Sequence, residues 1–374
     1  MKIAFVYDVP YPWHVGGIEM GNYNEAKELA KENEVHFFTM RWPGMEKEFT
    51  RDGIHYHAFH SVNDSKVYRH GRRSIREAFI FSLSMARLFT RRFDVVIANH
   101  FPILHLPLVK LYCRIYNCKL VIEVAEVWEP GYWMRYLNSN SGFLAYVYSR
   151  FLIKGADLYV AISSTTKNEM IKVGIDGSRI RTFIPIVDMD EINSVRHSEK
   201  KKLVMFAGRL VKEKRLDTWI KVFAKAYEKD KGIRGEIIGT GPERDMVLRL
   251  VKEMKLGRAI KVIKPFDDKT MLYRKMSEAS AFMNTSEREG LSIVSIESVA
   301  LGTPVIIPDY SPIPPEVRRL CIVDRTENLH ERLLEAIKGK RKVRLQPAKI
   351  EAFAVSSVLP FYRKEFERLR QKGR

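Results

Sequence analysis

The chain has 374 residues, which is more than one hydrophobic core usually spans, so two domains are expected. Hydrophobic residues make up 45% and charged residues 29%, as in ordinary globular proteins, and no run of roughly 18 apolar residues predicts a membrane-spanning helix. The net charge of +19 favours partners that carry phosphate, but it does not choose among nucleotides, nucleic acids and anionic membranes.

The first ten residues, MKIAFVYDVP, predict a buried strand rather than a signal peptide, so the chain is expected in the cytoplasm. The three cysteines lack the spacing of a disulfide framework or of a zinc site. We therefore expect buried thiols at Cys113, Cys118 and Cys321, and we expect no metal site.

Apolar runs in the first half alternate with stretches of helical periodicity, beginning with a helix near 18–31. The runs that predict strands are 2–7, 34–38, 54–59, 94–98, 120–124 and 157–162. In the second half, strands are expected at 203–207, 235–238, 260–263, 281–284 and 304–307. Helices are expected there at 216–228, 242–254, 269–278 and 293–301. Strands that alternate with helices need crossover connections, which are typical of parallel sheets.

Two polar stretches interrupt this alternation of strands and helices. Residues 188–202 predict a linker, and residues 338–349 precede a final helix expected at about 351–371. We therefore expect an α/β fold with Rossmann-like domains at 1–190 and 191–350, and with 351–374 packing back on the first. Two such domains in series place a ligand cleft between the carboxyl ends of their sheets.

The most informative stretch is NTSEREGLSIVSIE, from Asn284 to Glu297, which follows a strand and opens a helix. Glu289 lies in the loop, and Gly290 lets the backbone approach a ligand closely. The next amides are unpaired donors at a helix start, which suit a phosphate. They belong to Leu291, Ser292 and Ile293. Glu297, one turn into the helix, can accept hydrogen bonds from ribose hydroxyls, as an acidic residue does in dinucleotide folds.

Two further turns carry glycines and cations. Gly208 follows the strand at 203–207, and Arg209 and Lys214 could neutralise a departing diphosphate. The turn GTGPER, from Gly239 to Arg244, permits a tight passage from strand to helix, with Pro242 suited to the first helical position. Each feature has a plainer alternative, because surface cations are usually solvated and Glu297 could simply complement the helix dipole.

Taken together, the Gly208-Arg209-Leu element, the Gly-x-Gly-Pro-Glu-Arg turn and the Glu289-x7-Glu297 pair resemble the retaining glycosyltransferases of family 4. The order and spacing match through nearly the whole chain. The resemblance implies the GT-B fold, with two parallel sheets facing across a cleft. It also implies transfer of a sugar from a nucleotide diphosphate sugar to a hydroxyl acceptor, with the donor held mainly by the C-terminal domain. No cofactor beyond this donor substrate is expected.

The N-terminal motifs match the family less closely. The resemblance gives the loop residues Gly16 and Gly17 a donor-binding role. Asn99 and His100 follow the strand at 94–98, and we expect both to point into the cleft, where His100 contacts the acceptor or assists a proton. Many relatives carry a His-Asp pair where this chain has Ala125 and Glu126.

The stretch from Glu126 to Pro130 is similar to the Asp-Leu-Trp-Pro version in relatives with lipid-linked acceptors. Glu126 is therefore a candidate acceptor base or hydroxyl-binding carboxylate, and the alternative is an ion pair with Arg135.

A basic segment bears on the acceptor. Between Lys66 and Arg92 there are eight Lys or Arg residues and one acidic residue, Glu77, interleaved with apolar side chains. This composition favours a helical segment on an anionic membrane, and with it a lipid-linked or glycolipid acceptor. The alternative is an ordinary packed helix with a solvated basic face. Two other functions stay open, a nucleotide-sugar isomerase or hydrolase of the same fold and, without a recognised motif, a nucleic-acid-binding protein.

Overall fold

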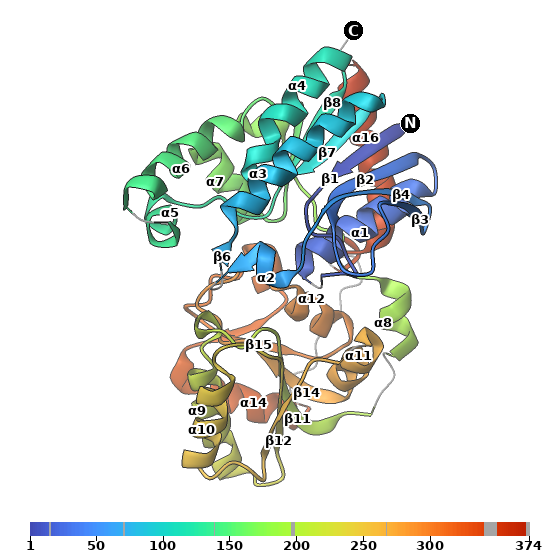
Figure 1. Cartoon of the computed structure of the whole chain (residues 1–374). Coiled ribbons are helices and arrows are strands. Elements are labelled where there is room, and N and C mark those ends of the chain that lie inside the picture. The colour runs from blue at the N-terminus through green and yellow to red at the C-terminus, as the bar shows by residue number, and fades with distance from the viewer. Residues whose placement is uncertain are drawn as a thin grey trace. The chain divides into compact units, whose positions relative to one another are not determined.

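The computed structural model describes residues 1–14, 16–69, 72–137, 139–195, 199–266, 268–339 and 350–371. It divides the chain into two compact units (Figure 1). Unit 1 comprises Met1–Ile186 and Val355–Arg374, and unit 2 comprises Val187–Ala354. None of the helices within the described ranges is both long and apolar enough to cross a membrane.

The sheet of unit 1 has the strand order β10-β9-β8-β7-β1-β2-β4-β3. Its strands are β1 (Lys2–Val6), β2 (Glu34–Arg41), β3 (Glu48–Arg51), β4 (Ile54–Ser61), β7 (Val95–Asn99), β8 (Lys119–Val124), β9 (Leu158–Ala161) and β10 (Ile180–Thr182). All neighbours pair in parallel except β3, which runs antiparallel to β4 at the edge. The six strands expected in this half are confirmed, whereas β3 and β10 are too short and polar to have been predicted.

Helices cover this sheet on both faces, which explains why β1 and β7 are apolar along almost their whole length. Figure 1 shows α3 (Ile75–Ser84), α4 (Leu106–Tyr116) and α6 (Ser139–Leu152) along one side, with α1 (Gly17–Ala30) and α16 (Val358–Gln371) on the other. Two further helices are α5 (Pro130–Tyr136) and α7 (Ser164–Lys172). Local signals set several ends, since Ser74 caps α3 and Ser163 caps α7 through their hydroxyl oxygens.

The basic segment is not one continuous helix, which corrects the sequence interpretation. It consists of α2 (Asp64–Val67), the short paired strands β5 (Tyr68–Arg69) and β6 (Arg72–Arg73), α3 and the 3-10 helix η1 (Met85–Thr90). The final helix also begins later than expected. The 3-10 turn η6 (Val355–Ser357) precedes α16, so the final helix starts at Val358 rather than near residue 351.

The C-terminal helix α16 is fixed to unit 1 by a buried polar contact. The hydroxyl of Tyr362 lies 2.9 Å from Oε2 of Glu25 on α1 and 3.0 Å from Oε1 of Glu123 on β8. Nδ2 of Asn99 donates to the other oxygen of Glu123 at 3.1 Å. All four side chains are buried, so the last helix of the chain completes the core of the first unit.

The sheet of unit 2 has the order β13-β12-β11-β14-β15-β16 and is parallel throughout its described strands. These are β11 (Lys201–Ala207), β12 (Arg234–Ile238), β13 (Ile260–Ile263), β14 (Ala279–Met283), β15 (Val305–Pro308) and β16 (Ile322–Asp324). The helices are α8 (Met189–Val195), α9 (Leu216–Lys229), α10 (Arg244–Glu253), α11 (Lys269–Glu278), α12 (Ile293–Ala300), α13 (Pro315–Arg318) and α14 (Leu329–Ile337). The five expected strands and four expected helices are confirmed.

Two local expectations for unit 2 are wrong. The stretch 188–202 contains helix α8, which begins there because Oδ1 of Asp188 accepts hydrogen bonds from the amides of Asp190 and Glu191. Pro242 is not the first residue of α10, because that helix starts at Arg244 after a turn. Most of the second polar stretch, residues 340–349, lies outside the described residues.

Candidate functional site

The strand order of unit 2 reverses its direction of winding between β11 and β14. With β11 as the first strand, the order is 3-2-1-4-5-6, so the connections after β11 and β14 leave the sheet toward opposite sides. Ligands of such sheets bind at this switch point, outside the carboxyl ends of the two strands. The loop from Gly208 follows β11 and the loop from Asn284 follows β14, so both sequence motifs occupy this position.

The loop after β11 is shaped by close backbone contacts with the turn after β12. The amide of Leu210 donates to the carbonyl of Thr240 at 2.9 Å, and the amide of Glu243 donates back to the carbonyl of Leu210 at 2.9 Å. A Cβ on Gly239 would fall on the carbonyl oxygen of Gly208, so only glycine fits there. The glycine turn therefore supports the loop that carries Arg209, whose side chain is exposed.

Glu289 is the centre of a polar cluster. Its Oε1 lies 2.6 Å from Nζ of Lys214, 3.1 Å from Nδ2 of Asn284 and 3.0 Å from Oγ of Ser286. Lys214 ends the 3-10 helix η4 (Lys212–Lys214) after β11, so this ion pair joins the loops that follow the two strands. The structure thus brings the predicted site residues Lys214 and Glu289 together, and it adds Asn284 and Ser286, which the sequence did not identify as members of the cluster.

Helix α12 begins beside this cluster. Its N-cap Ser292 has φ 68° and ψ 67°, and the Ser292 hydroxyl lies 2.8 Å from Nδ2 of Asn284. Within the described part of the chain, no group accepts a hydrogen bond from the amides of Leu291, Ser292 or Ile293. These donors lie just after Gly290, at a helix start where the dipole favours an anion. The arrangement can hold a phosphate group.

Glu297 lies on the buried side of α12 and is 3% exposed. Its Oε1 accepts a hydrogen bond from the hydroxyl of Tyr273 at 2.8 Å and lies 2.9 Å from Nζ of Lys269. Both partners come from α11, and sequence reasoning did not include them in the site. Burial and the negative charge of Glu297 raise the pKa of Tyr273, so its hydroxyl stays protonated and remains a donor.

Unit 1 has the same change of winding direction between β1 and β7. The chain leaves β1 toward Gly16, which caps α1, and Gly17, which is its first residue. Near this end Asp8 is buried and forms an ion pair with Arg73 at 2.6 Å. Burial raises the pKa of Asp8, and the neighbouring guanidinium opposes part of that shift.

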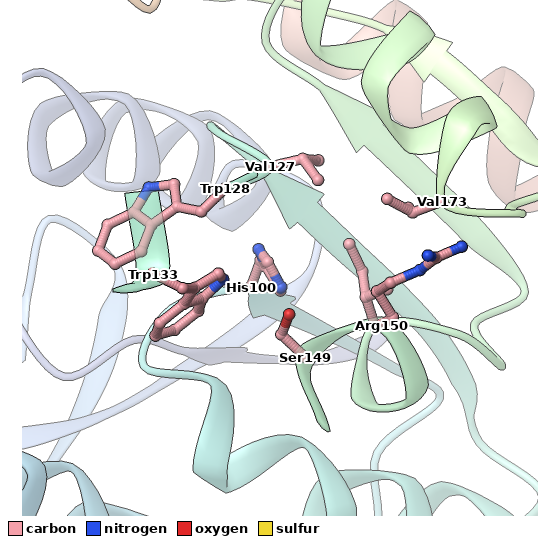
Figure 2. Close-up of a pocket in the computed structure, with 8 residues that line it drawn as sticks. His100, Val127, Trp128, Trp133, Ser149, Arg150 and Val173 are labelled. Carbon is pink, nitrogen blue, oxygen red and sulfur yellow. The ribbon is translucent and has the colours of Figure 1, made fainter. Parts of the chain in front are cut away.

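A small recess lies beyond the end of β7, with His100 at its base (Figure 2). Its volume is about 260 Å³, including space open to solvent, and Trp128, Trp133, Ser149 and Arg150 line it. His100 is buried, and neither ring nitrogen makes a hydrogen bond of normal geometry to the described residues. Burial lowers the pKa of His100 to about 4, although an interaction with the backbone of Glu126 opposes the shift, so the ring is neutral at pH 7.

The neighbours of His100 differ in part from the sequence expectation. Asn99 does not accompany His100 into the recess, because its amide is turned toward Glu123 in the core. Glu126 is half-buried, and its Oε2 accepts a hydrogen bond from Nε1 of Trp128 at 2.9 Å. Trp128 therefore links Glu126 to the recess, so that a carboxylate, a neutral imidazole and two indole rings come from the segments after β7 and β8.

Comparison with known proteins agrees with this architecture. Residues 15–191 match the family model of Glycosyltransferase Family 4, and residues 188–349 match that of Glycosyl transferases group 1. A solved structure of HepE from Anabaena, in complex with UDP and glucose, superposes with a TM-score of 0.71 at 14% identity. That match covers 98% of this chain and 100% of HepE, and it shows the fold.

Two curated relatives are more similar in sequence. N-acetyl-alpha-D-glucosaminyl L-malate synthase of Bacillus anthracis is 24% identical over 349 residues, which cover 88% of this chain and 86% of that enzyme. The N-acetylgalactosamine-N,N'-diacetylbacillosaminyl-diphospho-undecaprenol 4-alpha-N-acetylgalactosaminyltransferase of Campylobacter jejuni is 26% identical over 210 residues. These cover 54% of each chain, so the match spans about half the length of that relative.

The fold and the two family models define the class of this protein, which is a glycosyltransferase with the GT-B fold. Both of its units carry their own match, and the two matches together extend from residue 15 to residue 349. Within that class, the first unit is of the family 4 type, since residues 15–191 match the model of Glycosyltransferase Family 4.

Proposed function

We propose that the protein transfers a sugar, with retention of configuration, from a nucleoside diphosphate sugar to a hydroxyl of a lipid-linked saccharide. The proposal that this protein binds a nucleoside diphosphate sugar rests on the polar cluster around Glu289, at the ends of β11 and β14. There Lys214 and Glu289 lie 2.6 Å apart beside the open amides of Ser292 and Ile293. A cation and helix-start donors suit a diphosphate, and a carboxylate beside them suits sugar hydroxyls.

Each group then has a defined role in the transfer. Arg209, Lys214 and the amides that follow Gly290 bind the diphosphate, and Gly208 lets the backbone come close to it. Glu289 binds hydroxyls of the sugar, and Glu297 binds the ribose. As the bond between the anomeric carbon and the diphosphate oxygen breaks, the cations stabilise the negative charge that develops on that oxygen. The acceptor oxygen forms the new bond and releases its proton to the departing diphosphate. The donor roles of Gly16 and Gly17 stay predictions.

We propose that residues of unit 1 bind the acceptor. Indole rings suit the apolar faces of sugars, and the ring nitrogens of a neutral histidine can hydrogen-bond a hydroxyl. We assign His100 and Glu126 to acceptor binding, with Glu126 as the carboxylate that binds and orients the acceptor hydroxyl. The Campylobacter relative is named for a diphospho-undecaprenol substrate, and this name supports a lipid-linked acceptor here.

The decisive variant for the donor half is Glu289→Gln, which keeps the shape of the side chain and removes its charge. We expect turnover to fall by about 10² to 10³, because the group acts on the reacting sugar. Nucleoside diphosphate binding, measured by thermal shift with UDP and with GDP, should be largely kept. Glu287→Gln is the matched control, since Glu287 lies in the same loop but is exposed and paired with Arg215. Unchanged turnover in Glu289→Gln would reject the assignment.

A further inference from the structure

Helix α3 exposes a stripe of large apolar side chains. Ile75, Phe79 and Leu83 follow one another at four-residue spacing, which places them on one face of the helix. Each of the three is 55% to 60% exposed. The opposite side of α3 contributes Phe81 to the core, so the helix is apolar on both its buried and its exposed sides. A helix that only covers a sheet needs no such outer stripe.

Two neighbouring helices share this property. Leu111 and Ile115 are exposed one turn apart on α4, and Leu144, Tyr148 and Phe151 are exposed on one face of α6. Their exposed fractions lie between 49% and 70%. We call these five residues, together with the three on α3, the apolar face.

The three helices form one layer. The hydroxyl of Ser82 on α3 donates to the carbonyl of Leu104, just before α4, at 2.6 Å. The ammonium group of Lys110 on α4 donates to the carbonyl of Leu152, the last residue of α6. Figure 1 shows α3, α4 and α6 along the same side of unit 1. The exposed side chains of adjacent helices in one layer point away from the sheet, so the three stripes lie on the same side of unit 1.

The charged side chains on the helices of this layer are almost all cationic. Helices α3, η1, α4, α5 and α6 contain a single acidic residue, Glu77, which is 2% exposed and paired with His60 at 2.8 Å. The same helices contain six cations, which are Arg76, Arg87, Lys110, Arg114, Arg135 and Arg150. Two copies of such a face would repel one another, whereas lipid phosphates would be attracted to it.

Helix α6 connects this face to the recess. Its inner side supplies Ser149 and Arg150 to the wall around His100, which Figure 2 shows. Its outer side carries Leu144, Tyr148 and Phe151. The width of a single helix would therefore separate the apolar face from an acceptor head group bound in the recess, and a lipid tail can span that width.

We infer that the apolar face lies on an anionic membrane surface and delivers the lipid-linked acceptor to the recess around His100. The inference deepens the proposed function and rests on it for the identity of the acceptor, but membrane binding is measured without any catalytic assay. Apolar side chains would enter the boundary between head groups and acyl chains, while the surrounding cations contact lipid phosphates.

The test is co-sedimentation of the full chain with vesicles of phosphatidylcholine, with and without phosphatidylglycerol. We expect binding to the anionic vesicles only. The variant Phe79→Ser/Leu144→Ser/Phe151→Ser should lose at least tenfold in binding, because three large apolar groups leave the interface. Each of Arg76→Glu and Arg114→Glu should weaken binding at least about fivefold, since removing one surface cation alone costs about that much.

Controls come from unit 2. Met271→Ser removes a side chain that is 53% exposed, and Lys225→Glu reverses an exposed charge. Both should bind vesicles like the wild type. Thermal unfolding of the triple variant should match the wild type, and its thermal shift with nucleoside diphosphates should be unchanged. If the wild type did not bind nucleotides, that result would count against the proposed function, but it would not count against membrane binding by the apolar face.

Two outcomes would overturn the inference. One is equal vesicle binding by the wild type and the triple variant, or no binding by either. The other is a wild-type dimer in analytical ultracentrifugation that becomes a monomer in the triple variant without any vesicle binding, because the face would then be an interface between two copies.

Discussion

Tyr273 holds Glu297 through a single carboxylate oxygen. The Tyr273 hydroxyl and the Lys269 ammonium both contact Oε1, from two positions one turn apart on α11. A carboxylate fixed in this way presents its other oxygen in one orientation, so we assign Tyr273 as a positioning residue for the ribose contact proposed for Glu297.

The variant Tyr273→Phe tests this role, because it removes the hydroxyl and keeps the ring that packs in the core. A hydrogen bond to a charged group contributes about 1.5–3 kcal/mol, so KM for the donor should rise roughly 10-fold or more, with little change in kcat. If Tyr273 had a merely structural role, the variant would bind all nucleotides more weakly by the same factor. We instead expect the variant to lose its preference for a nucleoside diphosphate over the 2′,3′-dideoxy form. Tyr227→Phe on α9 is the control, and equal losses for both nucleotides would contradict the assignment.

The two sides of the candidate site differed in how far the sequence could predict them. The loops that carry Arg209, Lys214 and Glu289 follow strands with clear apolar patterns, so their place at the carboxyl edge of the sheet was predictable. The partners of Glu297 and the burial of His100 depend on contacts between segments 24 or more residues apart, as for Tyr273 and Glu297. The local sequence pattern of a strand or helix does not indicate such contacts. Asn99 was misplaced for the same reason, since its partner Glu123 lies on the next strand.

At the scale of single elements, the glycine turn after β12 sets the position of the loop after β11. Gly239→Ala would place a methyl group on the carbonyl oxygen of Gly208, so one of the two turns must move. We expect a loss of about 1–3 kcal/mol in the free energy of unfolding, together with weaker nucleotide binding because the segment carrying Arg209 shifts.

Chemical denaturation and thermal shift with nucleoside diphosphates measure the two effects. Gly257→Ala is the control, since a Cβ at Gly257 would meet nothing within 4 Å. If the Gly239→Ala variant were destabilised but kept its full affinity for nucleotides, the turn would not be needed to position the loop that carries Arg209.

Element boundaries show where local signals are sufficient. The helix at 269–278 was predicted to the residue, because Asp268 caps it and its periodicity ends at Glu278. The basic segment was wrongly expected to be helical throughout, because charge and apolar content do not reveal the paired strands β5 and β6 between α2 and α3. Helix α8 was missed because its seven residues are mostly polar, although Asp188 is a recognisable cap.

At the scale of the whole molecule, the buried pair Glu25 and Glu123 makes stability depend on pH. One phenol hydrogen cannot serve two carboxylates, so the contact with Tyr362 favours a protonated Glu25. Burial raises the pKa of Glu25 well above 4.5, and the nearby Glu123 raises it further. The folded protein therefore keeps a proton that the unfolded chain has lost. Stability from this group is full below pH 4.5 and falls as the pH rises toward the pKa of the folded state.

Glu25→Gln should remove that loss, because an amide can donate to the same partners without ionising. We expect the variant to gain stability over the wild type at pH 8, by about 1.4 kcal/mol for each unit by which the pKa is raised, and to gain little at pH 4.5. Urea unfolding at a series of pH values measures the difference. Glu28→Gln, on the same helix but facing Lys31, is the control. A constant difference between Glu25→Gln and the wild type at all pH values would exclude the proposed protonation.

The return of α16 to unit 1 makes the second unit an insertion between two segments of the first. Residues Val187–Ala354 form one uninterrupted stretch, whereas the other unit needs both ends of the chain. A stop codon after Ala354 would therefore damage the half of the protein that is synthesised first, by withdrawing Tyr362 from between its two carboxylates. During synthesis on the ribosome, the first half must wait for the last residues before its core is closed, and the inserted half can fold before it.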